Sequence, residues 1–390
     1  MRILTRYVVF DLLKVFLLTV TGLTMIIFVV LMGKEAVDKG FGLGPLVRIA
    51  PYLLPQALQF AVPGTMLLAT TSVYGRMASY NEVVAIKSLG ISPMVLIWPT
   101  LVVATLTSFV AVVLNDLAVS WGRLGAERVF LESIEEVAYG QLRVRHNFNL
   151  GPLNVRVRAV EGHKLIDAMI IQQPFGGQPG RAAWAEEAEL FAHPEVGVLV
   201  AKLYNSDFEA EMTLVHPRVS EWRLPLKSTE DDIRSPSTYA LAEVGPAIGE
   251  QEKFLECLED SMTAQAAFGM MTGNFEVLSD TAWQPSEEKV RTAQTRLHRL
   301  HTEPWRRWAN GFSCLCFVLI GAPVAIWFRY SEFLASFFIC FLPILLVYYP
   351  LLMVSVDQAK DGTFPPQSVW IGNILLSLAG VWLLRRVNRY

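Results

Sequence analysis

Residues 94–115 read MVLIWPTLVVATLTSFVAVVLN and belong to an uncharged run between Lys87 and Asp116. A helix needs about 20 predominantly apolar residues to cross the hydrocarbon core of a bilayer, so this run is long enough. The composition of the whole chain agrees with a membrane location. Hydrophobic residues make up 53% of it and charged residues only 18%, and its mean hydropathy is +0.37. We therefore expect an α-helical membrane protein.

Five further apolar segments of sufficient length predict a total of six transmembrane helices. The six segments lie between Lys14 and Lys34, Arg48 and Arg76, Lys87 and Asp116, Arg307 and Arg329, Glu332 and Asp357, and Asp361 and Arg385. Three precede and three follow residues 116–304, which hold 29 acidic against 18 basic residues, whereas the rest of the chain holds 7 against 15. We expect transmembrane helices 1–3 in residues 1–115, a soluble insert in 116–304 and helices 4–6 in 305–390.

The Lys and Arg residues of the short loops predict the direction of these helices, because such residues are enriched on the cytoplasmic side. Six crossings place both termini on the same side of the membrane. That side holds nine basic residues: Arg2, Arg6, Lys14, Arg76, Lys87, Arg329, Arg385, Arg386 and Arg389. The other side holds four: Lys34, Lys39, Arg48 and Lys360. We therefore expect cytoplasmic termini, with residues 116–304 in the periplasm if the cell has two membranes.

The pattern of the insert favours β structure. Residues 153–159, LNVRVRA, are apolar at every second position, and residues 196–203 and 208–215 are β-branched or aromatic runs. Such runs predict short strands and a β-sandwich or β-jellyroll-like domain. From about residue 286 to residue 301 the pattern becomes helical, and this helix is expected to continue into the fourth span. Residues 239–284 are ambiguous, with a helix considered only at 252–264.

The segment YGRMASYNEVVAIKSLGISP, residues 74–93, is the longest loop on the expected cytoplasmic side. Ser79 and Glu82 have the spacing of a capping box, and Gly90 and Pro93 suit a helix end. We expect a short helix at about 79–90 on the membrane surface. Glu82 then has two open interpretations: it caps this helix, or it docks a cytoplasmic partner.

The same segment resembles the coupling loop of the LptF/LptG (YjgP/YjgQ) permeases, whose pattern is roughly G-R-x-x-S-x-x-E-x-x-A-x-[RK]-x-x-G-x-S. The matching residues are Gly75, Arg76, Ser79, Glu82, Ala85, Lys87, Gly90 and Ser92. Further similarities are Arg6-Tyr7-Val8-Val9 with Lys14, Glu303-Pro-Trp-Arg306, Gly321-Ala-Pro323, and Trp370 with Asn373. No residue of the stretch 220–290 matches. The resemblance leaves open which of the two permeases this is, with a slight lean towards LptF.

This resemblance implies a permease subunit of an ABC exporter that extracts lipopolysaccharide, or a related glycolipid, from the inner membrane and passes it to a periplasmic β-jellyroll bridge. The implied partners are an LptB-like ATPase dimer, a second LptF/LptG-like permease and LptC/LptA-like jellyroll proteins. The implied ATPase-coupling residues are Arg76, Ser79, Glu82, Lys87 and Gly90.

Two groups of residues are candidates for lipid binding. Lys34, Lys39 and Arg48 stand at the outer ends of the first two spans. They serve as interface anchors or, as the resemblance implies, attract the phosphates of a glycolipid. The second group comprises inward positions of an apolar trough expected in the β domain: Val155, Val157, Leu199 and Phe208.

Several kinds of activity have no support in the sequence. There is no G-x-x-x-x-G-K-[ST] motif, so any ATP hydrolysis is expected in a separate subunit, and neither G-x-S-x-G nor H-E-x-x-H occurs. His298 and His301 lack a third ligand at metal spacing and are interpreted as a hydrated helix face. A pI of about 6.1 without basic runs excludes nucleic acid as a main ligand. We expect no catalytic residues, metal or cofactor. The alternative function is a membrane-anchored periplasmic binding or sensor protein without transport.

Overall fold

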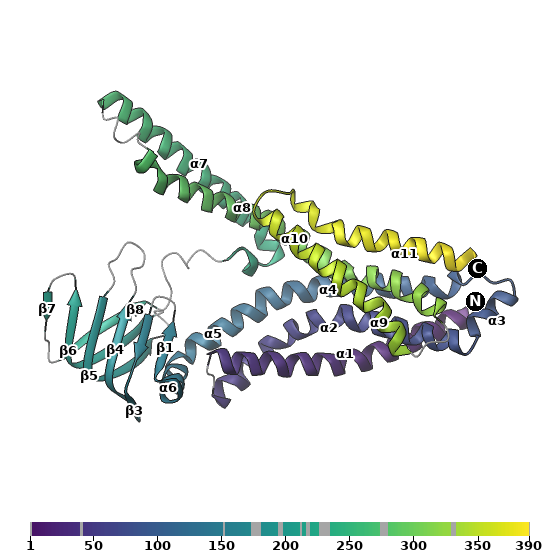
Figure 1. Cartoon of the computed structure of the whole chain (residues 1–390), viewed down its shortest axis with the longest axis horizontal. Helices are drawn as coiled ribbons and strands as arrows, with labels where there is room; N and C mark the ends of the chain where they lie inside the picture. Colours follow the sequence, from purple (N-terminus) through teal and green to yellow (C-terminus); the bar gives the residue numbers. More distant parts are fainter. Residues whose placement is uncertain are drawn as a thin grey trace. The chain divides into compact units, whose positions relative to one another are not determined.

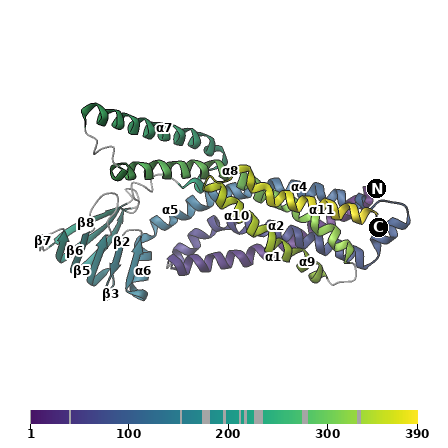
Figure 2. The same cartoon turned by 45° about the horizontal axis from the view of Figure 1, so that its top comes forward.

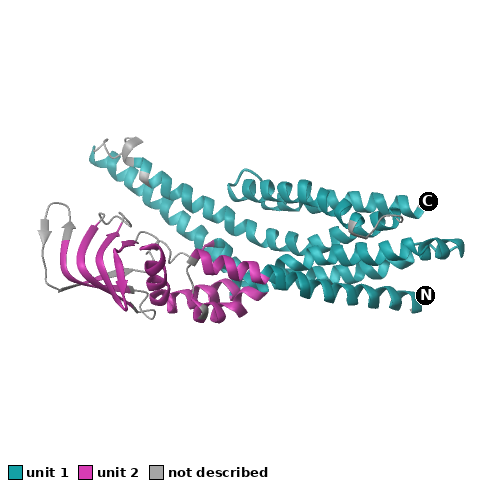
Figure 3. Ribbon diagram, turned by 60° about the horizontal axis from the view of Figure 1, so that its bottom comes forward, with its two compact units in different colours: residues 1–27, 55–120, 236–390 teal, residues 28–54, 121–235 magenta. Residues whose placement is uncertain are grey.

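The computed structural model consists of long helices and one antiparallel β-sheet (Figure 1). The structure describes residues 2–39, 42–150, 153–172, 181–193, 198–210, 213–215, 219–225, 235–273, 280–328 and 333–389. The chain divides into two compact units (Figure 3). Unit 1 comprises residues 1–27, 55–120 and 236–390, and unit 2 comprises residues 28–54 and 121–235.

Unit 1 is helical, and it shares the first two helices of the chain with unit 2. Its helices are α1 (Arg2–Lys39), α2 (Leu43–Ser79), α3 (Glu82–Ser88), α4 (Met94–Leu117), α7 (Leu241–Thr272), α8 (Asp280–Trp327), α9 (Phe333–Pro343), α10 (Tyr349–Lys360) and α11 (Ile371–Arg389). The short elements are η2 (Pro236–Thr238), the π-helical turn η4 (Ile344–Tyr348) and η5 (Pro366–Trp370). The π-helical turn follows Pro343, which has no amide proton for a regular helical hydrogen bond.

Five helical segments within the described residues are long and apolar enough to cross a membrane: Ile3–Asp38, Met94–Glu132, Ser286–Trp327, Ala335–Lys360 and Pro366–Asn388. They contain five of the six predicted spans. The sixth predicted span lies in α2, a helix of 37 residues. Prolines 51, 55 and 63 and two glutamines make this segment less apolar than the others. The prediction of a helical membrane protein with an inserted β region is therefore confirmed.

The predicted continuation of the pre-span helix into the fourth span is also confirmed, because α8 is one helix of 48 residues. The ambiguous region forms α7, which has 32 residues and packs beside the first half of α8 (Figures 1 and 2). The Gln251 side chain donates a hydrogen bond to the Ala293 carbonyl across this helical pair (3.1 Å). The C-terminal part of the insert is thus a helical hairpin, of which the sequence pattern predicted only the second helix.

Unit 2 contains the β-sheet and the helices next to it. The helical elements are the π-helical η1 (Ala118–Arg123), which straddles the boundary between the units, α5 (Leu124–Glu132) and α6 (Ile134–Arg145). The strands are β1 (Asn147–Leu150), β2 (Leu153–Arg156), β3 (Ala159–Glu161), β4 (Lys164–Gln172), β5 (Arg181–His193), β6 (Val198–Ala210), β7 (Thr213–Val215) and β8 (Val219–Pro225). They form one antiparallel sheet in the order β1-β2-β4-β5-β6-β7, with β3 also paired to β4 and β8 to β6.

One face of the sheet is apolar and buried. Val155 of β2 pairs with Ile170 of β4, which pairs with Ala183 of β5, and all three side chains are buried. Arg156, the next residue along β2, is exposed, as the period of two requires. Buried residues of α6 join the same apolar cluster as this face: Ile134, Val137, Ala138, Tyr139 and Leu142. The predicted alternation is therefore correct, and α6 helps to cover the apolar face.

Three polar residues mark a line across the middle of the sheet. Asp167 of β4 and Asn205 of β6 have positive φ angles of 50° and 49°. Both stand opposite Glu186 of β5, at the point where regular pairing is interrupted. Asn and Asp adopt this left-handed conformation more readily than other side chains that bear a Cβ. Pairing resumes beyond Asn205, and β6 continues to Ala210. Residues 198–203 and 208–210, which belong to two runs expected to begin separate strands, therefore lie in one strand.

Candidate functional site

The loop between α2 and α4 contains the short helix α3. The predicted capping box is wrong. Ser79 is the last residue of α2, and its hydroxyl donates to the carbonyl of Arg76 (2.9 Å). The residue before α3 is Asn81, which is left-handed (φ 59°) and makes no side-chain capping bond. The turn at Asn81 leaves Ser79 in the preceding helix, where its hydroxyl bonds to a carbonyl of α2. Glu82 is then the first residue of α3.

The C-terminal end of α3 agrees with the prediction. Gly90 has a φ of 76°, which suits glycine because it lacks a Cβ. Its amide donates to the carbonyl of Lys87 (2.9 Å), and the amide of Ile91 donates to that of Ile86 (3.2 Å). These two bonds form a Schellman motif, which satisfies carbonyls that the helix leaves open.

The two sides of α3 have different surroundings. Val83 is buried in the apolar cluster of the helical bundle, and Ile86 packs against that cluster. On the outside, Tyr80 is 71% and Leu89 75% exposed, and Val84 is also exposed. The side chain of Glu82 is partly exposed and forms no hydrogen bond or ion pair with the described part of the chain. The helix therefore presents an acidic group among exposed apolar side chains.

Contacts with distant helices hold this loop in place. The side chain of Arg76 pairs with Asp11 of α1. That of Lys87 donates to the carbonyl of Val387 near the C-terminus (2.9 Å), and the hydroxyl of Ser92 donates to Asn388 Oδ1 (2.7 Å). The sequence predicts a role for Arg76 and Lys87 but none for Asp11 and Asn388, because no local pattern connects these two residues to the loop.

The Tyr74 hydroxyl lies between α2 and α4. It is 2.8 Å from the carbonyl of Leu96, to which it donates, and 2.6 Å from Oγ1 of Thr100. Tyr74 and Thr100 are both completely buried. These contacts join the two helices on either side of α3.

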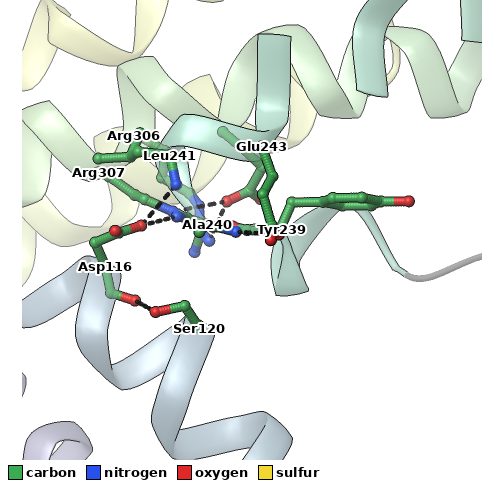
Figure 4. Close-up of polar contacts among 9 residues, drawn as sticks. Asp116, Ser120, Tyr239, Ala240, Leu241, Glu243, Arg306 and Arg307 are labelled. Carbon is green, nitrogen blue, oxygen red and sulfur yellow. Dashed lines mark hydrogen bonds and ion pairs between the residues drawn. The ribbon is translucent and has the colours of Figure 1, made fainter. Parts of the chain in front are cut away.

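A second polar site lies where α4, α7 and α8 meet (Figure 4). Oδ1 of Asp116, near the end of α4, accepts hydrogen bonds from Nη1 of Arg307 (2.6 Å) and from the amide of Leu241 (2.8 Å). Nη2 of Arg307 donates to the carbonyl of Tyr239 (2.6 Å). Asp116 therefore supplies the cap that Ala240, with its methyl side chain, cannot give to the start of α7.

Two further charges complete this site, which we call the charge cluster: Asp116, Glu303, Arg306 and Arg307. Glu303 Oε2 lies 2.6 Å from Nη2 of Arg306 and 3.7 Å from Nε of Arg307. The side chains of Arg307 and Glu303 are 0% and 2% exposed. The two negative and two positive charges of the cluster cancel. This pairing offsets part of the free energy that it costs to remove charged groups from water. The cluster joins three helices and offers no nucleophile or metal site.

The basic lipid candidates differ in their surroundings. Lys34 is exposed on α1, and the side chain of Lys39 lies outside the described residues. Arg48 borders a cavity of about 530 Å³ in unit 2 whose lining also includes Glu132, Glu135 and Glu136. This cavity mixes charges of both signs, so Arg48 does not belong to a purely basic pocket.

The apolar lipid candidates lie on the sheet. Val155 and Leu199 are completely buried and Val157 is nearly so, all in the cluster that includes α6. Phe208 is in β6, opposite Ala183, but its side chain lies outside the described residues. Val155, Val157 and Leu199 therefore face the interior as predicted, and other side chains of this cluster pack around them.

Residues 6–386 match the sequence model of one protein family, described as the lipopolysaccharide export system permease LptF/LptG. The chain belongs to the LptF/LptG family. It is therefore a permease of the lipopolysaccharide-export ABC transporter and a multi-pass protein of the inner membrane, and the ATPase of such a transporter is a separate protein. This result decides against the alternative of a sensor without transport. No curated protein gives a significant match.

In this LptF/LptG permease, motifs found in the sequence serve helix packing. A Cβ at Gly321 would lie 2.9 Å from Leu67 Cδ1, so glycine lets α8 pack against α2 without displacing the Leu67 side chain. The Asn373 amide donates to the carbonyl of Ala309 (2.7 Å), which joins α11 to α8. Glu303 and Arg306 belong to the charge cluster.

Proposed function

We propose that this permease couples to its ATPase through α3, with Glu82 as the central docking residue. In this proposal the termini and residues 74–92 are cytoplasmic, whereas residues 116–304 are periplasmic. The chain pairs with a second LptF/LptG-like permease above an LptB-like ATPase dimer. Lipopolysaccharide passes from the complex to LptC/LptA-like jellyroll proteins.

The observation that carries the docking proposal is the division of α3 into two sides. Val83 and Ile86 fix the helix to the bundle, while Tyr80, Glu82 and Leu89 remain accessible. An ATPase groove with an apolar floor and a basic group would complement this surface. Movement of α3 would then reach α2 and α4 through the apolar cluster that Val83 shares with both helices, and the hydrogen bonds of Tyr74 join these two helices to each other.

Arg76, Ser79, Lys87 and Gly90 have a supporting role in the proposal. Their polar groups contact other parts of this chain, or shape the end of α3, and are therefore less available to a partner. They position the helix, and Glu82 with its apolar neighbours meets the ATPase.

The experiment compares Glu82→Gln with Asp361→Asn after co-expression with the ATPase. Both substitutions remove one negative charge, but Asp361 is an exposed residue at the end of α10, on the side proposed to be periplasmic. We expect Glu82→Gln to weaken ATPase binding at least about tenfold and to lower lipid export, because the basic partner group is left unpaired. Asp361→Asn should leave both unchanged. Normal assembly and export by Glu82→Gln would refute the docking role.

For lipid transfer we propose that Lys34, Lys39 and Arg48 attract glycolipid phosphates at the outer membrane surface. The acyl chains then follow the apolar face of the sheet, along Val155, Val157, Leu199 and Phe208. Since Val155, Val157 and Leu199 are buried in one cluster with α6, lipid reaches them only after α6 separates from the sheet. The buried apolar face supports this route, because acyl chains need an apolar surface of this kind.

A further inference from the structure

A groove of about 850 Å³ lies beside α3, between the ends of α2, α8 and α11. Val83 and Val84 of α3 line it together with Ile326 and Trp327 of α8. Two basic side chains, Lys87 and Arg386, also contribute to its lining, and no described lining residue is acidic. The groove therefore combines apolar walls with two positive charges.

Arg386 is held in an orientation that leaves its guanidinium group accessible. Its Cζ lies 4.5 Å from the ring centroid of Trp327 and 5.5 Å from that of Trp382. Stacking on aromatic rings orients a guanidinium group without using its N–H donors. Among the described residues Arg386 has no acidic partner and remains exposed. Its five donors are available for an anion.

The second cation of the groove is only partly engaged. Lys87 uses its hydrogen bond to Val387 to hold the C-terminal segment, and an ammonium group has three N–H donors. The charges of Lys87 and Arg386 thus face one groove without a negative charge from the described lining. Binding of an anion would relieve their mutual repulsion.

The shape and place of the groove indicate which anion it takes. In the proposed orientation it opens at the cytoplasmic membrane surface, where tryptophans such as Trp327 and Trp382 are typically found. Inorganic phosphate would occupy a small part of 850 Å³ and would leave the valine, isoleucine and tryptophan walls unused. A lipid with a phosphate headgroup matches both the charges and the apolar walls.

We propose that this groove binds the headgroup of an anionic phospholipid from the cytoplasmic leaflet. Arg386 and Lys87 contact the phosphate, and Val84, Ile326 and Trp327 contact the upper acyl chains. Because Val83 and Lys87 belong to α3, an occupied groove stabilises the position from which α3 meets the ATPase. The site rests on the proposed orientation of the chain, but lipid binding itself requires no ATPase.

The test uses the full chain alone in phosphatidylcholine nanodiscs, with and without phosphatidylglycerol. Retention of phosphatidylglycerol is measured by native mass spectrometry for Arg386→Gln and for Arg385→Gln. Arg385 is the matched control, because it is the exposed neighbour and does not line the groove. We expect Arg386→Gln to weaken phosphatidylglycerol binding about tenfold, since it loses a charge-assisted hydrogen bond, and Arg385→Gln to bind normally.

Three results would overturn the proposal. One is equal retention of phosphatidylglycerol by both variants. Another is complete displacement of the lipid by inorganic phosphate, which would make the groove a site for free anions. The third result has two parts: the unmodified chain shows no selective binding of phosphatidylglycerol, and Arg386→Gln loses ATPase binding. Together they would make Arg386 a contact for a protein. As the first measurement uses the isolated chain, its failure is distinguishable from failure of the Glu82 proposal. If Arg386→Gln does not fold, Trp327→Leu serves as the second variant, with the same expected loss.

Discussion

Single buried polar groups hold together parts of the chain that are far apart in sequence. The Tyr139 hydroxyl, on α6, donates to the carbonyl of His163 (2.7 Å) and accepts from the amide of Leu190 (3.0 Å). It thereby connects α6 with the edge of β4 and with β5 in unit 2. Burial raises the pKa of Tyr139 above the usual value of 10.0, because the charged phenolate is poorly solvated there.

We predict that Tyr139→Phe destabilises the protein by about 1–3 kcal/mol, because the buried amide of Leu190 loses its hydrogen-bond acceptor. Thermal unfolding monitored by circular dichroism measures this loss. The raised pKa means that the phenol stabilises the fold below pH 10 and that this contribution disappears as the pH rises through the pKa of the folded state. The difference between the two proteins should therefore shrink in strong alkali. Tyr204→Phe, on the partly exposed surface of β6, is the control and should have little effect.

Arg307 is the basic residue that joins both carboxylates of the charge cluster. Arg307→Met leaves Asp116 and buried Glu303 without their shared partner and should cost about 3–5 kcal/mol, measured as a lower midpoint of thermal unfolding. Asp116→Asn keeps an oxygen that accepts from the Leu241 amide but removes a charge. Combining the two substitutions should therefore cost less than the sum of their separate effects. Additive effects would contradict this coupling. Arg299→Gln, exposed on the same helix, is the control.

The sequence predicted those helices and strands that local periodicity determines. The apolar runs identified the long helices, and alternation at 153–159 identified an inward face of the sheet with Val155 and Val157. The predicted start of α3 was wrong, because the actual start depends on the left-handed backbone of Asn81. The spacing of Ser79 and Glu82 does not reveal this conformation. Asp11 and Asn388 were missed for another reason: they meet the coupling loop only after helices from distant parts of the sequence have packed.

The interrupted line across the sheet gives a prediction for one position on β6. Asn205 has a φ of 49°, and its side-chain amide donates to Glu186 Oε2 (2.9 Å). Asn205→Val should lower stability by about 1–2 kcal/mol, because a β-branched residue tolerates the left-handed region poorly. Asn205→Gly loses the same side-chain bond but suits this backbone conformation, so it should be closer to the original protein. Comparison of their unfolding midpoints separates backbone strain from the lost hydrogen bond, and equal destabilisation would contradict the strain explanation.

For the whole molecule, composition predicted a membrane protein, whereas the long helical hairpin of α7 and α8 was recognised only in its second helix. Residues 239–284 mix charged and apolar side chains without a clear period, and Pro246 and several glycines lower their helix propensity. Packing against α8 overcomes this weak preference, as the buried Val244, Ala247 and Gln251 illustrate. The proposed orientation of the whole chain in the membrane rests on a count of basic residues, nine against four, and it can be tested on this hairpin.

The hairpin carries a natural probe of its own location. Cys257 on α7 is exposed, whereas Cys314, Cys316 and Cys340 are buried, and the sequence contains no other cysteine. A bulky maleimide that cannot cross the inner membrane should therefore react at one position. We predict that it labels Cys257 in cells whose outer membrane alone has been made permeable, because the proposed orientation places residues 116–304 in the periplasm. Cys257→Ser should abolish the labelling, which assigns the signal to α7. Labelling of Cys257 only after the inner membrane is opened would reverse the orientation, and the ATPase could then no longer reach α3.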